Sequence, residues 1–99
     1  MTRRYSIAAS ASRDLNEISE YFMNRNVEAG ERLIQEFNRK CNNLIQFSNI
    51  GRSYGHISPG LRGMPLQGYI ILYEVTDDTV TILHVVSGRQ DLETLLGDR

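Results

Sequence analysis

The sequence predicts an α+β fold in which an N-terminal helical hairpin packs on one antiparallel sheet. The expected element order is strand, helix, helix, strand, strand, strand. Three observations lead to this class: apolar residues recur at helical spacing in the first half of the chain, they alternate at a period of two in the second half, and short turns join the later segments. The length of 99 residues suits one domain over residues 1–99, and 40% hydrophobic with 23% charged residues is ordinary globular composition.

The first predicted strand covers residues 5–8, where Tyr5 and Ile7 share one face. Helical spacing follows it, with Ser12 as the expected N-cap. The apolar stripe of this helix consists of Ala11, Leu15, Ile18, Tyr21 and Phe22. The acidic side chains Asp14, Glu17 and Glu20 are expected to face outward.

A second helix is predicted after a short interruption at Asn24 and Asn26. Its apolar stripe consists of Ala29, Leu33, Ile34, Phe37, Cys41, Leu44 and Ile45. So short a connection favours two antiparallel neighbouring helices, which form the hairpin.

Residues 48–60 are too rich in Gly, Ser and Pro for a regular element, so we expect a long loop. Loops of this length in a small domain are often functional. The stretch 48–73 contains Arg52, His56 and Arg62 and no Asp or Glu, which makes it locally cationic. Tyr54 in this loop is interpreted as an amphipathic anchor, with stacking on a base or a partner ring as the alternative.

Three strands in an antiparallel meander are predicted at residues 61–66, 69–75 and 80–86, joined by tight turns. Both faces of this sheet are apolar. In the middle strand Ile70 and Leu72 point one way, and Tyr69, Ile71, Tyr73 and Val75 the other. In the last strand Val80, Ile82, His84 and Val86 are expected on one face, and Leu83 and Val85 on the other.

Two helices cover only one face of a sheet, so the second face needs a cover of its own. Leu92, Leu95 and Leu96 are expected to supply part of it. A partner chain or a second copy is expected to supply the rest.

Several classes of protein are excluded by composition and motifs. The formal net charge of −1 gives no bulk attraction to nucleic acid or anionic membranes. The one cysteine, Cys41, cannot form an internal disulfide, which fits the cytoplasm. No run is long and apolar enough to span a membrane, and no metal-ligand or phosphate-loop motif occurs, so we expect no membrane, metal or cofactor binding. A lone histidine such as His84 is more often structural than catalytic.

Five strings carry a resemblance to a known family. They are residues 11–21 (ASRDLNEISEY), Gly51-Arg52, residues 60–65 (GLRGMP), residues 69–75 (YIILYEV) and residues 87–92 (SGRQDL). In this order and spacing the chain resembles the ParE/RelE toxin superfamily of bacterial type II toxin–antitoxin systems, and within it the ParE branch.

The resemblance implies a cytoplasmic toxin neutralised by a cognate antitoxin, whose flexible segment folds over the helices and the sheet. The candidate antitoxin contacts are Tyr21, Phe37, Ile70 and Leu72. ParE-like members inhibit DNA gyrase by binding rather than by catalysis, and the candidate target contacts here are Arg62, Arg89, Leu92 and Leu95. A toxin dimer within the antitoxin complex is compatible with this interpretation.

Two alternatives stay open. A RelE-like, ribosome-dependent mRNA endoribonuclease would use Arg62 and Arg89 for phosphate and His84 or His56 as general base, but the low net charge disfavours docking to ribosomal RNA. The other alternative is a non-toxic antitoxin-binding relative. Members of the ParE branch commonly carry Arg at the position of His84 and His at that of Ser87, and this departure keeps that alternative open.

Overall fold

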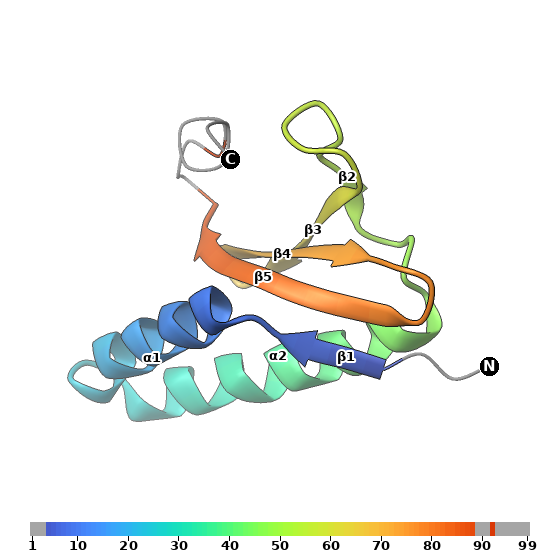
Figure 1. The fold of residues 1–99 in the computed structure, drawn as a ribbon. Helices are drawn as coiled ribbons and strands as arrows, with labels where there is room; N and C mark the ends of the chain where they lie inside the picture. Colours follow the sequence, from blue (N-terminus) through green and yellow to red (C-terminus); the bar gives the residue numbers. More distant parts are fainter. Residues whose placement is uncertain (1–3, 89–91, 93–99) are drawn as a thin grey trace.

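A helical layer and a sheet layer face each other in the structure, a computed structural model that describes residues 4–88 and Leu92. Figure 1 shows the two helices side by side beneath the sheet, with β1 continuing directly into α1. The elements are β1 (Arg4–Ile7), α1 (Ala9–Met23), α2 (Val27–Gln46), β2 (Arg52–Ser53), β3 (Leu61–Leu66), β4 (Tyr69–Val75) and β5 (Thr79–Ser87). The predicted fold class and order of elements are confirmed, with β2 as an addition.

The sheet is mixed rather than fully antiparallel. Its strand order is β1-β5-β4-β3-β2, and β1 runs parallel to β5, with Ile7 opposite Ile82. Short turns force the neighbours β3, β4 and β5 to run antiparallel. The chain between β1 and β5 contains both helices and three strands, so no short connection dictates the direction of β1.

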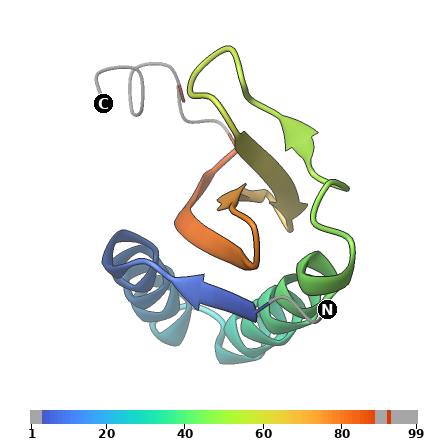
Figure 2. The same cartoon turned by 45° about the vertical axis from the view of Figure 1, so that its right-hand side comes forward.

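The predicted long loop contains a short strand of its own. In β2, Arg52 lies opposite Gly63 and Ser53 opposite Arg62, which adds an edge strand to β3. Beyond β2 the chain rises away from the helical layer before it returns as β3, as Figure 2 shows from a second angle. This segment is therefore partly regular, contrary to the expectation of an irregular loop.

A bulge in β5 changes which side chains face the helices. Leu72 lies opposite His84 but Tyr73 lies opposite Ile82, so Leu83 is an extra residue in β5. One extra residue reverses the alternation beyond it. Val85 consequently joins the core under the helices and Val86 the opposite face, so the prediction for these two residues was wrong.

The side chains form two apolar clusters, one on each face of the sheet. The inner core lies between helices and sheet and comprises Ala11, Ile18, Leu33, Phe37, Cys41, Leu44, Met64, Leu66, Ile71, Tyr73, Val80, Ile82 and Val85. The outer cluster comprises Leu61, Leu72 and Val86, with Tyr54, Ile57, Ile70, Leu83 and Leu92 packed against it. The expected cover from Leu92 is confirmed, whereas Leu95 and Leu96 lie outside the described residues.

The two helices begin in different ways. The N-cap of α1 is Ala8 rather than Ser12, because the helix follows β1 without a loop, and the Ser12 N–H donates to the Ala8 carbonyl at 3.0 Å. The N-cap of α2 is Asn26, whose side chain accepts from the N–H of Ala29 at 3.1 Å. Within the described residues, neither helix is long and apolar enough to cross a membrane.

Candidate functional site

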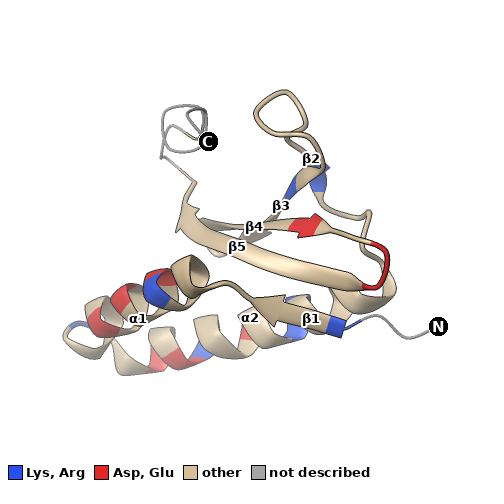
Figure 3. Cartoon of the chain, viewed as in Figure 1, with Lys and Arg blue, Asp and Glu red and all other residues tan. Residues whose placement is uncertain are grey.

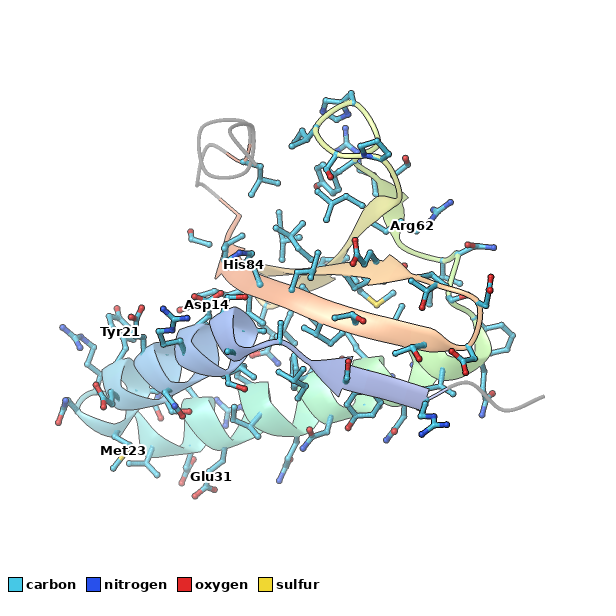
Figure 4. All side chains as sticks on the ribbon, viewed as in Figure 1. Asp14, Tyr21, Met23, Glu31, Arg62 and His84 are labelled. Carbon is cyan, nitrogen blue, oxygen red and sulfur yellow. The ribbon has the colours of Figure 1, made fainter. Side chains whose placement is uncertain are left out.

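Arg62, a predicted target contact, is tied to the chain that precedes β2. Its Nη1 donates to the carbonyl of Gly51 at 2.8 Å and to that of Asn49 at 3.3 Å. The side chain is half-buried at one end of the sheet, as Figure 4 shows. The guanidinium therefore acts as a clamp on the segment that leads into β2.

Tyr73 holds the same segment from within the inner core. Its fully buried hydroxyl donates to the Ser48 carbonyl at 2.9 Å and accepts from the Gly51 N–H at 3.0 Å. Burial raises the pKa of Tyr73, against smaller opposing effects of the Gly51 N–H and the Arg62 charge. Gly51 is required at this point, because a Cβ there would collide with the Tyr73 hydroxyl.

The outer side of this segment carries the aromatic residues of the predicted loop. The Tyr54 ring covers Gly63, where an added Cβ would lie 2.6 Å from Tyr54 Cε2. Arg52 and His56 are exposed on either side of Tyr54 in the sequence. Tyr54 packs against the outer cluster, so its interpretation as a loop anchor is confirmed.

His84 pairs with α1 rather than with an arginine. Its Nδ1 lies 3.1 Å from Asp14 Oδ2, an atom that also accepts from the Val85 N–H at 3.0 Å. Arg62 engages the segment before β2 instead, so the structure does not join Arg62 and His84 into one acid–base site. Asp14, expected to face outward, lies against β5 (Figure 4).

A cavity of about 250 Å³ adjoins the Asp14–His84 pair. Its lining residues are Asp14, Glu17, Ile18, Tyr69, His84, Val85, Val86 and Ser87. Among the described residues, the lining contains two carboxylates and neither Lys nor Arg. The charges that residues 4–88 and Leu92 place beside His84 are therefore unfavourable for a phosphate of RNA.

A larger groove of about 470 Å³ lies on the helical hairpin. It is lined by Ser19, Phe22, Met23, Val27, Gly30, Glu31, Ile34 and Gln35. Met23 and Val27 are 69% and 54% exposed, which is high for apolar side chains. Gly30 lets the helices approach, since a Cβ at this position would lie 2.8 Å from Phe22 Cβ.

The candidate antitoxin contacts differ in their exposure. Tyr21 is 50% exposed beside the groove, its ring meeting Phe22 edge-on and the Arg25 guanidinium at 4.0 Å. Ile70 is half-buried on the outer face. Phe37 and Leu72 are 2% and 0% exposed, so they are core residues rather than contact residues.

The remaining candidates lie at the C-terminal end of the chain. Leu92 packs on the outer cluster, and Arg89 and Leu95 lie outside the described residues. Burial raises the pKa of the Cys41 thiol to about 12, which keeps it protonated and unreactive. Across residues 4–88 and Leu92, no three His, Cys, Asp or Glu side chains gather in a way that could hold a metal ion.

These features define a small α+β protein in which a helical hairpin with an apolar groove covers one face of a mixed sheet and a second apolar cluster lies on the other face. Comparison with known proteins agrees with this class. The family described as "ParE toxin of type II toxin-antitoxin system, parDE" matches residues 5–92, and the chain belongs to this family.

Individual relatives support the assignment. Toxin ParE3 of Caulobacter vibrioides is 26% identical over 76 residues, which cover 77% of this chain and 76% of that protein. A solved structure described as the chromosomal ParDE TA system from P. aeruginosa has the same fold, with a TM-score of 0.72 at 20% identity. The match covers 88% of this chain and 96% of that one.

Proposed function

We propose that this ParE-family toxin acts in the cytoplasm, arrests growth by binding DNA gyrase, and is neutralised by an antitoxin that covers its helical hairpin. One observation carries the choice of binding over catalysis: Arg62 and His84, two of the four groups named for the nuclease alternative, are both engaged in structural contacts. The acidic lining beside His84 supports the same choice.

For the target, we propose the outer face of the sheet and the chain that follows β5. Leu92 already lies on this face, and Arg89 and Leu95 flank it in the sequence. Arg62 contributes indirectly on this proposal, by holding the segment that leads into β2.

For the antitoxin, we propose that an amphipathic segment inserts an apolar side chain into the groove between α1 and α2. Met23 and Val27 expose apolar surface there, and Glu31 supplies a carboxylate at the groove. Together they fit a segment with an apolar face flanked by a basic residue.

Pulse-labelling tests the proposed target. DNA and protein synthesis are measured within minutes of inducing the toxin without an antitoxin. Early loss of DNA synthesis with continued translation is the expected result, and purified toxin should then inhibit supercoiling by gyrase. If translation stops first, the RelE-like alternative replaces gyrase inhibition. If neither process changes while folded toxin accumulates, the chain is a non-toxic antitoxin-binding relative.

Two surface variants test the proposed antitoxin groove. Met23→Asp and Glu31→Lys are expected to weaken capture of the toxin by its antitoxin about tenfold or more, since each places the wrong charge in an apolar interface. The control is Asp77→Lys, an exposed charge change in the turn between β4 and β5. Equal antitoxin affinity for all three variants and the parent would place the antitoxin elsewhere.

A further inference from the structure

A cationic and aromatic surface lies on the outer side of the β2–β3 segment, next to the outer face that we propose for the target. We propose that Arg52, Tyr54 and His56 form a contact surface for single-stranded DNA. The proposed function assigns no role to these three side chains. The choice of DNA over RNA rests on the proposed function, because the proposed target works on DNA.

Charge is the first support for this surface. Residues 48–73 contain no Asp or Glu, and Arg52 and His56 are both exposed. Figure 3 shows basic positions on β2 and β3, whereas acidic positions lie on the helices, at the end of β4 and in the turn after it. A phosphate backbone would therefore meet no acidic side chain from this segment.

The arrangement of the rings is the second support. The Tyr54 and His56 ring centroids lie 6.1 Å apart with an angle of 36° between the ring planes. The Arg52 guanidinium carbon lies 5.5 Å from the Tyr54 ring centroid, within the range of a cation–π contact. Two rings and a planar cation thus gather within one short segment.

The surface is held in place before any ligand arrives. The N–H of Tyr54 donates to the Leu61 carbonyl at 2.8 Å, and the Tyr54 carbonyl accepts from Ile57 at 2.9 Å. Gly63 leaves room for the Tyr54 ring, and Arg62 clamps the segment from the other side of the sheet. A fixed segment loses little conformational entropy when it binds.

The chemistry of the three side chains selects the kind of ligand. Unpaired bases stack on aromatic side chains, and a guanidinium binds a phosphate through oriented hydrogen bonds. An acidic peptide would use the cation but would have no need of the rings, and paired bases in a duplex have no free faces for them. Unpaired DNA satisfies both requirements.

Fluorescence anisotropy with a labelled oligo(dT) of about 12 nucleotides, at about 50 mM salt, tests this surface in the full chain. We expect saturable binding that weakens as salt rises. Tyr54→Ala and Arg52→Ala should each lower the affinity about fivefold or more, and Tyr54→Phe should retain it. Arg32→Ala, which removes an exposed arginine from α2, is the matched control and should bind like the parent.

Several outcomes would overturn the proposal. Two of them are the absence of oligo(dT) binding and equal affinities of the parent and Arg52→Ala for oligo(dT). A third is that poly-glutamate competes as well as unlabelled oligo(dT), which would indicate a surface for acidic peptides. Tighter binding of oligo(U) than of oligo(dT) would overturn the choice of DNA. If Tyr54→Ala does not fold, His56→Ala decides in its place, because His56 is exposed. Pulse-labelling of the parent tests gyrase inhibition separately, so the two failures are distinguishable.

Discussion

The Nδ1 atom of His84 lies 3.1 Å from Oδ2 of Asp14, and the same oxygen accepts the N–H of Val85 at 3.0 Å. This contact joins α1 to β5 just beyond the point where β1 ends, since β1 pairs with β5 only as far as Ile82. The Ser10 hydroxyl extends the junction by donating to the Leu83 carbonyl at 2.6 Å. Beyond the end of β1, side chains of α1 therefore make the hydrogen bonds to β5 that a neighbouring strand would otherwise make.

Asp14→Ala is expected to lower the free energy of unfolding by about 1–3 kcal/mol, because it leaves the Val85 N–H and the His84 ring without their acceptor. Urea denaturation at neutral pH measures the change. Glu17→Ala is the control, an exposed carboxylate on the same helix, and should change the free energy by no more than about 0.5 kcal/mol. Equal decreases in the free energy of unfolding for the two variants would mean that the Asp14 contact does not stabilise the protein.

Tyr73→Phe is expected to destabilise the protein by about 1–3 kcal/mol, because the Gly51 N–H and the Ser48 carbonyl both lose their hydrogen bond to the buried hydroxyl. Amide hydrogen exchange should quicken at Gly51 before it changes in the helices. Tyr21→Phe, in a half-exposed ring, should leave both measurements unchanged. Unaltered exchange at Gly51 in Tyr73→Phe would refute the role of this hydroxyl.

Gly51→Ala and Gly55→Ala form a matched pair within one segment. A Cβ at Gly51 would collide with the Tyr73 hydroxyl and lie 2.9 Å from the Gly63 carbonyl, whereas at Gly55 the nearest atom is Ser53 Oγ at 3.4 Å. Gly51→Ala should therefore lower the midpoint of thermal unfolding clearly, and Gly55→Ala should leave it nearly unchanged. Similar midpoints for both variants would show that the segment adjusts freely.

The stability of the protein should fall at alkaline pH, with Cys41 as one cause. Burial raises the pKa of its thiol to about 12, whereas the thiol of an unfolded chain has a pKa of about 8.5. The stabilisation is complete below the unfolded pKa and is lost as pH rises toward the folded one. The raised pKa of Tyr73 acts with the same sign.

Urea denaturation between about pH 8 and pH 11 measures this decline. Cys41→Ala should show a shallower decline than the parent, and a thiol reagent should label the parent at pH 8 only after denaturation. Rapid labelling of the native parent would contradict the buried, protonated thiol.

The types of most elements were predictable because each buries one stripe or face, which leaves a period of 3.6 or 2 in the sequence. The apolar stripes of both helices and the alternation in β4 are examples. Ile70 and Leu72 lie on the outer face, and Ile71 and Tyr73 on the inner one, as expected.

The predictions that were wrong depend on contacts between distant residues. Asp14 follows helical spacing like an outward residue, but it faces β5 because β1 ends early and leaves the Val85 N–H to be paired. The bulge at Leu83 places Val85 and Val86 each on the face opposite to the one expected. No Gly or Pro marks the bulge in the sequence. Arginine is usually a surface residue, and the sequence around Arg62 does not indicate its hydrogen-bond partners. These partners are carbonyls of residues 49–51, and only the folded path of that segment brings them to the guanidinium.

The short outer strands also limit how the protein can associate. Exposed strand edges invite other chains to extend a sheet, and proteins that resist aggregation keep such edges short or blocked. Beyond β2, the edge of β3 contains Pro65, which has no N–H to donate, and its carbonyl accepts from Lys40 Nζ at 2.6 Å. On the opposite side, Ser10 and Asp14 occupy the edge of β5. Self-templated polymerisation through these parts of the sheet edge is thereby disfavoured.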